Sequence, residues 1–304
     1  MKVLVATEKP FAAVAVDGIR KVVENAGYEL VLLEKYTEKA QLLEAVADVD
    51  AMIVRSDIVD EEVVKAAKNL KIVIRAGAGY DNLDLKACTE AGVVAENTPG
   101  QNSNAVAELV FGMAIMAARS MYSGASGTEL KGKRLGIQAF GQVGRNVARI
   151  AEGFGMTVQV DPYCVKKIAD FPNITAAETL EDLYANNNFV SVHIPAKPTT
   201  IGSIGYDLIT KMPKGGILIN TARKEVIDEA GLEKALEERT DLKYVSDVKP
   251  ANAETLEQKF PGRVFFTPKK MGAQTSEANI NAGIAAADQA VAYLRDGIDT
   301  FRVN

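Results

Sequence analysis

The sequence has 304 residues, a length that favours two lobes of ordinary domain size over a single core. Hydrophobic residues make up 47% and charged residues 25%, and the formal net charge of -5 comes without a basic tract, which argues against a nucleic-acid surface. The two cysteines, Cys88 and Cys164, lack the spacing of a metal site and are too few for a disulfide framework. We therefore expect no metal, no nucleic-acid partner and a reducing, cytoplasmic location.

The first residues, MKVLVATEKP, have the pattern of a strand and not of a signal peptide. Further strands are predicted at 29–33, 52–55 and 72–75, with helices at 11–26, 38–46 and 60–67. The pattern pauses around Asn97-Thr98-Pro99-Gly100, and a long apolar helix follows from about 105 to 120. Glu108 interrupts that helix, which is too short to span a membrane, so we expect no membrane partner.

A second series of short apolar runs begins at 134–138. Its other strands are predicted at 157–160, 189–193, 217–220, 244–247 and 264–267, and the last helix at 276–295, with Gly297 as its stop signal. Strands that alternate with helices across short breaks indicate parallel sheets covered by helices on both faces. We therefore predict an α/β protein of two doubly wound parallel-sheet lobes, with a ligand bound between them at the carboxyl ends of the strands.

A dinucleotide-binding turn is predicted where the second series begins, at Ala139-Phe140-Gly141-Gln142-Val143-Gly144. Gly141 lets the backbone approach a pyrophosphate, Gly144 lets the helix pack on the strand, and the N–H groups of Gly141, Gln142, Val143 and Gly144 face the anion together with the helix dipole. Asp161 follows at the end of the next strand, where it can accept hydrogen bonds from the adenine ribose. Its charge would repel a 2′-phosphate, which favours NAD over NADP. Ala139 stands where the fingerprint has its first glycine, so a purely structural turn is the alternative.

Three strand ends in the second series carry candidate reactive groups. Arg223 ends a buried strand and can grip a carboxylate at two points, although a surface ion pair is the alternative. His193, the only histidine, is the first candidate for a proton donor, but a histidine at a strand end is more often structural. Lys269 and Lys270, taken alone, have the character of solvated surface charge.

In the first lobe, Arg55-Ser56 ends one predicted strand and Arg75 ends the next, before the turn Ala76-Gly77-Ala78-Gly79. Two arginines beside a small-residue turn with free N–H groups form an anion-friendly surface. A plain turn is the alternative.

In combination, several ordered motifs resemble those of the D-isomer-specific 2-hydroxyacid dehydrogenases across essentially the whole chain. They are Arg75-Ala-Gly-Ala-Gly-Tyr-Asp-Asn82, Asn97-Thr-Pro-Gly100, Val106-Ala-Glu108, Leu135-Gly136, Gly141-x-x-Gly144, Asp161-Pro162, Ser191-Val-His-Ile-Pro195, Asn220-Thr-Ala-Arg223 and Thr267-Pro with Gly272-Ala273. Asn97-Thr-Pro-Gly-Gln-Asn-Ser-Asn104 and Lys269-Lys-Met-Gly-Ala-Gln274 are most similar to the short D-3-phosphoglycerate dehydrogenases of that family.

The resemblance implies a substrate-binding domain from residues 1–98 and 276–304, a Rossmann NAD-binding domain from 99–275, and a homodimer. It implies that Arg223 binds the substrate carboxylate and polarises the carbonyl. The other substrate contacts it implies are the backbone of Gly77, Ala78 and Gly79 for the same carboxylate, and Arg55 with Ser56 for a distal phosphate. The further predicted cofactor contacts are His193 and Pro195 and, along the nicotinamide side as the resemblance implies, Thr221, Ala222 and Asp247.

Two departures from the family pattern concern the proton. Most of the family has a histidine as acid/base before the Gly-Ala pair, and here that position is Lys270. Most of the family also has a partner glutamate, and here that position is Asn252, with Glu254 as a weaker candidate for a shifted carboxylate. The absence of the histidine and the absence of the partner glutamate are consistent with each other, because a carboxylate partner would hold a lysine in its protonated form. We therefore predict Lys270 as the acid/base, with Lys269 or His193 as alternatives.

The predicted function is NAD-dependent oxidation of D-3-phosphoglycerate to 3-phosphohydroxypyruvate, a step of serine biosynthesis. One alternative is a glyoxylate or hydroxypyruvate reductase on the same fold without a phosphate site. Another is a dinucleotide-sensing binding protein that has lost catalysis, for which the missing histidine and glutamate are the best argument.

Overall fold

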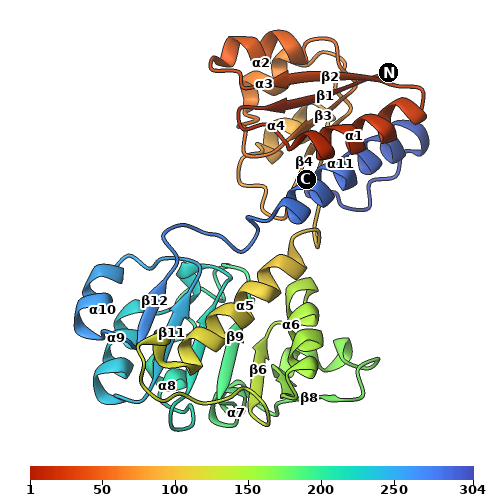
Figure 1. Cartoon of the computed structure of the whole chain (residues 1–304). Coiled ribbons are helices and arrows are strands. Elements are labelled where there is room, and N and C mark those ends of the chain that lie inside the picture. The colour runs from red at the N-terminus through yellow and green to blue at the C-terminus, as the bar shows by residue number, and fades with distance from the viewer. The chain divides into compact units, whose positions relative to one another are not determined.

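The computed structural model describes all 304 residues, and the chain divides into two compact units. Unit 1 comprises Met1–Asn102 and Gln274–Asn304, and unit 2 comprises Ser103–Ala273. Unit 1 is therefore built from both ends of the chain, drawn in red to orange and in blue in Figure 1.

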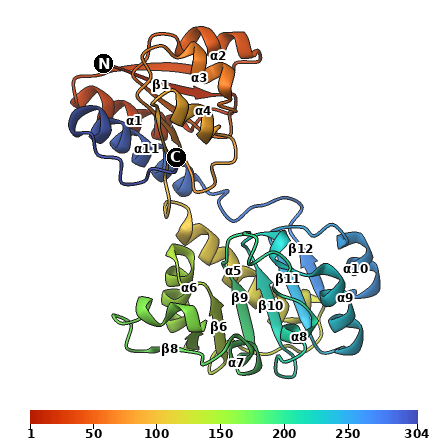
Figure 2. The ribbon, with the colours of Figure 1, turned by 180° about the vertical axis from the view of Figure 1, so that it is seen from behind.

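Unit 1 contains a five-stranded parallel sheet with the strand order β2-β1-β3-β4-β5. The strands are β1 (Lys2–Thr7), β2 (Glu29–Glu34), β3 (Ala51–Val54), β4 (Ile72–Arg75) and β5 (Val94–Asn97). The helices are α1 (Ala13–Asn25), α2 (Lys39–Val46), α3 (Glu61–Ala66), α4 (Leu85–Glu90) and α11 (Ser276–Asp296). α1 and α11 lie side by side on one face of the sheet in both views, although they come from opposite ends of the sequence (Figure 1, Figure 2).

Both faces of this sheet are buried, which explains the nearly continuous apolar runs of its strands. Successive residues alternate between two cores: Val3, Val5 and Ile53 pack against α1 and α11, whereas Leu4 and Met52 pack on the opposite face. Helix α11 ends at Gly297, which adopts the left-handed conformation (φ 69°) expected of a glycine stop signal.

Unit 2 contains a seven-stranded parallel sheet with the order β12-β11-β10-β9-β6-β7-β8. The strands are β6 (Arg134–Gln138), β7 (Thr157–Val160), β8 (Ile174–Ala176), β9 (Phe189–Val192), β10 (Ile217–Asn220), β11 (Lys243–Ser246) and β12 (Val264–Phe266). The α-helices are α5 (Ser103–Ala118), α6 (Gln142–Gly153), α7 (Leu180–Ala185), α8 (Tyr206–Ile209), α9 (Glu229–Glu238) and α10 (Ala253–Lys259), and 3-10 turns occur at Ser120–Tyr122, Pro162–Lys167 and Lys224–Val226.

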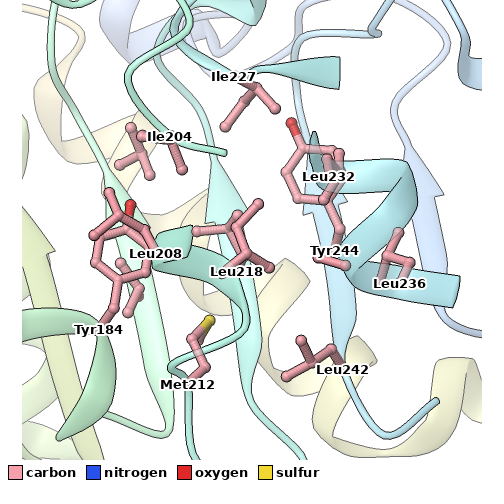
Figure 3. Packing of buried hydrophobic residues seen from close by; sticks show 14 of the residues in the cluster. Tyr184, Ile204, Leu208, Met212, Leu218, Ile227, Leu232, Leu236, Leu242 and Tyr244 are labelled. Carbon is pink, nitrogen blue, oxygen red and sulfur yellow. The ribbon is translucent and has the colours of Figure 1, made fainter. Parts of the chain in front are cut away.

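Two apolar cores cover the faces of the second sheet. Helices α5 and α6 cover one face, and α8 and α9 pack over the other on a cluster that includes Leu218, Leu232 and Tyr244 (Figure 3). The two large phenols of this cluster keep polar partners: the Tyr184 hydroxyl donates to Gln138 Oε1 (2.7 Å), and the Tyr244 hydroxyl lies 3.5 Å from Asn220 Nδ2. The rigid core thus extends up to the strand ends that carry the candidate residues.

The predicted fold class is confirmed: both units are doubly wound parallel α/β sheets, and the strand order of unit 2 is that of a Rossmann fold. Two strands, β5 and β8, were not predicted from the sequence. Glu96 and Asn97 interrupt the apolar pattern of β5, and β8 has only three residues and lies at the sheet edge. No helix of the chain has both the length and the apolar character needed to cross a membrane.

In each sheet the strand order reverses at one point, and this point locates the candidate site. The reversal lies between β1 and β3 in unit 1 and between β6 and β9 in unit 2. Ligands of doubly wound sheets bind outside the carboxyl ends of the strands at such a reversal. Arg55 directly follows β3, and the Ala139–Gly144 turn directly follows β6, so each unit has a candidate residue at its own reversal.

Candidate active site

The Ala139–Gly144 turn has the form that a pyrophosphate requires. Gly141 is the N-cap of α6, and a Cβ atom at this position would have no neighbour within 4 Å, so its backbone borders open space. A Cβ atom on Gly144 would lie only 2.4 Å from the Ala139 carbonyl oxygen, so the helix can pack this closely on the turn only with glycine there. Gln142 is exposed and Val143 partly exposed at the first turn of α6. An N-terminal helix end with open backbone N–H groups fits an anionic cofactor.

Asp161 lies at the end of β7 beside this turn, and its side chain is buried. Its Oδ2 accepts a hydrogen bond from the Ala139 N–H (2.5 Å), and its Oδ1 accepts one from the Tyr163 N–H (2.9 Å). The carboxylate predicted to contact the ribose is therefore also part of the framework of the turn. This contact was not predictable from the sequence, because it depends on the conformation of Ala139.

His193 follows β9, and its backbone N–H donates to Gln138 O of the neighbouring strand (2.9 Å). Its Nε2 lies 2.9 Å from the Ser191 hydroxyl. Burial lowers the pKa of His193 to about 3, so the imidazole is neutral across the physiological range. A neutral imidazole is a poor proton donor, which weakens the case for His193 as the acid. Pro195, two residues on, is exposed.

The end of β10 holds Arg223 through a turn organised by Asn220. The Asn220 side chain accepts from the Ala222 N–H (2.9 Å) and donates to Arg223 O (2.9 Å). The partly buried Arg223 guanidinium donates to Ala222 O (2.9 Å) and forms no salt bridge with a carboxylate. The neighbouring Thr221 hydroxyl is buried without a hydrogen-bond partner. An unpaired cation beside an unsatisfied hydroxyl suits a polar, anionic ligand.

Asp247, at the end of β11, holds the turn that carries the two lysines. Its Oδ1 accepts from the Met271 N–H (2.7 Å) and the Thr267 hydroxyl (2.9 Å), and its Oδ2 accepts from the Gly272 N–H (2.8 Å). The carboxylate is 1% exposed. Lys269 and Lys270, just before these two N–H groups, are exposed. Asp247 therefore fixes the backbone that follows Lys270, a contact that strand-end spacing alone could not reveal.

Asn252, predicted from the sequence to replace the family's partner glutamate, is the N-cap of α10. Its backbone N–H donates to Glu229 Oε2 (3.2 Å), and its Nδ2 lies 3.4 Å from Glu233 Oε2, while its Oδ1 is buried without a partner. The Asn252 amide is thus bonded to α9. Glu254, the weaker candidate, is exposed on α10.

In unit 1, Arg55 directly follows β3 and Arg75 is the last residue of the adjacent strand β4. The Arg55 guanidinium donates to Lys9 O (2.9 Å), Pro10 O (3.0 Å) and Asn279 Oδ1 (2.9 Å), and Arg75 Nε donates to Arg55 O (3.0 Å). Neither arginine forms a salt bridge with a carboxylate.

Burial lowers the pKa of both arginines, and the charge of Arg55 lowers the pKa of Arg75 further. The two guanidinium groups are therefore partly desolvated and repel each other, and a bound anion would relieve both effects.

The Gly77–Gly79 turn lies against Arg75. A Cβ atom on Gly77 would lie 1.4 Å from Arg75 Nη1, and its φ of 148° is unfavourable for other residues, so only glycine fits. Ala78 is exposed, and its carbonyl accepts from Asn97 Nδ2 (2.7 Å), which anchors the turn to the end of β5. Ser56, the other predicted phosphate contact, is exposed beside Arg55.

Comparison with known proteins defines the class of this protein. Residues 105–268 match the D-isomer specific 2-hydroxyacid dehydrogenase, NAD binding domain. The chain therefore belongs to this dehydrogenase family, and NAD is the cofactor of its central domain. The predicted family and cofactor are both confirmed.

Three individual relatives are similar to this chain over most of its length. A solved structure of NAD+-bound 3-phosphoglycerate dehydrogenase from Entamoeba histolytica is 48% identical, with a TM-score of 0.85 over 100% of this chain and 98% of that one. The D-3-phosphoglycerate dehydrogenase of Methanocaldococcus jannaschii is 34% identical over 84% of this chain and 52% of its own length. The hydroxypyruvate reductase of Thermotoga maritima is 35% identical over 84% of this chain and 88% of its own. The chain thus spans about half the length of the first of these curated relatives.

Proposed function

We propose that this chain catalyses the NAD-dependent oxidation of D-3-phosphoglycerate to 3-phosphohydroxypyruvate, the reaction named for several of its relatives. The proposal rests mainly on the pair Arg55 and Arg75 in unit 1, two partly buried guanidinium groups that form no salt bridge, although Asp57 and Asp81 interact with them electrostatically at longer range. A 2-hydroxy acid without a phosphate would leave the two guanidinium groups without an ion-paired anion, whereas a phosphate would accept several charge-assisted hydrogen bonds from them.

The rest of the substrate is assigned to groups at the other strand ends. Arg223 would bind the carboxylate in a bidentate manner, and the N–H groups of the Gly77–Gly79 turn would bind the same carboxylate. Arg55, with Ser56, would bind the phosphate. In this arrangement unit 1 supplies the substrate-binding domain and unit 2 the NAD-binding domain.

The cofactor would be held by groups of unit 2. The pyrophosphate is assigned to the N–H groups of Gly141, Gln142, Val143 and Gly144, and the adenine ribose to Asp161. The remaining contacts are assigned to His193, Pro195, Thr221, Ala222 and Asp247. When bound, NAD accepts the hydride from the substrate carbon.

We assign the proton to Lys270. In oxidation, the neutral amine of Lys270 takes the proton of the substrate hydroxyl as the C–H bond gives up its hydride; in reduction, the ammonium returns it to the forming alkoxide. Arg223 would polarise the same oxygen. A neutral His193, with its pKa lowered to about 3, is a weaker donor at neutral pH. A homodimer and a cytoplasmic location belong to the same proposal.

The test is to follow NADH absorbance with the purified protein and three ketone substrates: phosphohydroxypyruvate, hydroxypyruvate and glyoxylate. We expect phosphohydroxypyruvate to give the highest kcat/KM by at least about 100-fold, because hydrogen bonds to charged groups contribute roughly 1.5–3 kcal/mol each. Similar kcat/KM values for all three substrates would favour the alternative, a hydroxypyruvate or glyoxylate reductase. The similarity to the Thermotoga maritima hydroxypyruvate reductase supports this alternative. No oxidation of NADH with any of them would favour a binding protein without catalysis.

A further inference from the structure

The first residue of the dinucleotide turn has an unusual backbone conformation. Ala139 has a φ of 78°, in the left-handed region that glycine adopts readily and alanine does not. It occupies the position where the dinucleotide fingerprint has its first glycine. The turn is therefore strained at this residue, and some other part of the structure must hold it there.

The residues that follow β7 hold this conformation. The Ala139 N–H donates to Asp161 Oδ2 (2.5 Å), and the next N–H, that of Phe140, donates to Cys164 Sγ (3.2 Å). The Cys164 thiol in turn donates to Asp161 Oδ2 (3.5 Å). Burial raises the pKa of Cys164, which keeps the thiol protonated and able to donate. Two successive N–H groups of the turn are thus bonded to one buried cluster, and both would lose their acceptors if Ala139 relaxed to negative φ.

The Asp161 carboxylate is nearly saturated by these bonds. Oδ2 accepts from Ala139 and Cys164, and Oδ1 accepts from the Tyr163 N–H (2.9 Å). A carboxylate offers about four lone-pair sites, so roughly one remains for a ribose hydroxyl. The larger share of this side chain's hydrogen bonding is directed to the protein itself.

We propose that Asp161 is a positioning residue for the phosphate-binding turn in addition to any contact with the ribose. Its carboxylate, together with the Cys164 thiol, keeps Ala139 left-handed and so keeps the N–H groups from Gly141 to Gly144 directed at the pyrophosphate. This inference rests on the proposed placement of NAD at the turn. It predicts that the requirement for Asp161 depends on which residue is at position 139, since glycine adopts this φ without help.

A double-mutant cycle of Asp161→Asn and Ala139→Gly tests the dependence, with the dissociation constant of NADH from fluorescence titration as the readout. Asp161→Asn keeps the shape of the side chain but replaces one acceptor oxygen by an N–H donor. In the Ala139 protein we expect it to weaken NADH binding by more than about 10-fold. Combined with Ala139→Gly it should weaken binding at least about 5-fold less, because a left-handed alanine carries a penalty worth roughly that factor.

The loss of NADH affinity that Asp161→Asn still causes in the Ala139→Gly protein measures the ribose contact. The part of the loss that Ala139→Gly removes measures the positioning role. If the two substitutions are additive within about 2-fold, Asp161 acts on the ribose alone and the proposal is wrong. Lys35→Gly is the matched control: Lys35 is also left-handed (φ 56°) but lies in unit 1, so it should not rescue Asp161→Asn.

The same cycle is measured without cofactor, by thermal unfolding of the apo protein. We expect Asp161→Asn to lower the melting temperature and Ala139→Gly to restore part of that loss. If Asp161→Asn does not fold in either background, Cys164→Ala replaces it in the cycle, with Cys164→Ser as the conservative variant that keeps a hydrogen-bonding group for Phe140. Rescue in this cycle supports the proposal, and additivity overturns it. Failure of the wild type to bind NADH would instead count against the proposed function and leave the unfolding cycle interpretable.

Discussion

Units 1 and 2 have the same architecture, a doubly wound parallel sheet with one reversal of strand order, but their strand ends recognise anions by different means. In unit 1 the strand ends carry two guanidinium groups, Arg55 and Arg75, with no carboxylate bridged to either. In unit 2 the Ala139–Gly144 turn that follows β6 (the β6 turn) offers backbone N–H groups. Two carboxylates hold backbone N–H groups in place: Asp161 binds one in this turn, and Asp247 binds two in the turn that contains Met271 and Gly272. Unit 1 therefore relies on charged side chains to recognise an anion, whereas unit 2 relies on the conformation of its backbone.

The difference teaches where each kind of change should act. Loss of a cation in unit 1 should mainly weaken binding of a charged substrate, although Arg55 also donates three hydrogen bonds within the unit. Loss of a carboxylate in unit 2 should disturb the turn that it holds, and so displace the adjacent groups that are proposed to bind cofactor or substrate. The following variants are ordered from the largest expected effect to the smallest.

Lys270→Met should reduce turnover by roughly 10²- to 10⁴-fold, because general acid–base catalysis contributes about that much. Binding of NADH should stay within about 2-fold of wild type, since Lys270 lies outside the β6 turn. Steady-state kinetics and a fluorescence titration measure the two quantities. Lys269→Met, the adjacent exposed lysine, is the control and should retain most of the turnover. Near-normal turnover of Lys270→Met would transfer the role to Lys269 or His193.

Arg55→Ala should raise KM for phosphohydroxypyruvate by about 10- to 100-fold, as expected for lost hydrogen bonds to a charged group. KM for hydroxypyruvate should change little. Arg20→Ala removes an exposed arginine of unit 1 that pairs with Glu24, and it serves as the control for a general change of charge. An equal rise in KM for both substrates would argue against a phosphate site at Arg55.

Asp247→Asn should lower kcat by about 10-fold, because one of the Met271 and Gly272 N–H groups would face an amide N–H in place of an oxygen. The pH profile of kcat should also change if Lys270 moves with the turn. Thr267→Ser keeps the hydroxyl that donates to Asp247 and is the conservative control. A fall in melting temperature with unchanged kcat and pH profile would show a purely structural role for Asp247.

His193 should contribute a dependence of stability on pH. Its pKa is about 3 in the folded protein, below the usual value near 6.5, because burial disfavours the charged form. Between these two values the unfolded chain binds a proton that the folded chain excludes, so stability is lost as the pH falls from about 6.5 toward 3. His193→Gln should have a flatter dependence of melting temperature on pH over that window. An identical slope in both proteins would contradict a desolvated, neutral imidazole.

The sequence predicted the repeating parts of this molecule well. Short, nearly continuous apolar runs located ten of the twelve strands, and they failed only where polar residues or short length broke the pattern, as in β5 and β8. Strand ends also pointed to Arg55, Arg223 and the β6 turn, because parallel strands bring their carboxyl ends to one edge.

The contacts that organise the site were not predictable in the same way. Asp247 was expected beside the nicotinamide, and its bonds to Met271 and Gly272 depend on a turn of irregular geometry. Cys164 was considered only as a metal ligand or disulfide partner, whereas its Sγ accepts from Phe140. Such contacts depend on the local backbone conformation, which residue type alone does not specify, as the left-handed Ala139 shows.

The position of α11 beside α1 has a consequence for how this protein is made. Unit 1 buries Ala282, Ala286 and Ala290 of α11 against Ile19 and neighbouring residues of the N-terminal segment. The N-terminal segment leaves the ribosome long before α11 has been synthesised. Contacts between segments so distant in sequence also form slowly. During synthesis the apolar surface that α11 will cover is exposed while unit 2, continuous in sequence, can already fold. A chain truncated before Ser276 should therefore aggregate through unit 1 and need chaperone protection that the full chain needs only briefly.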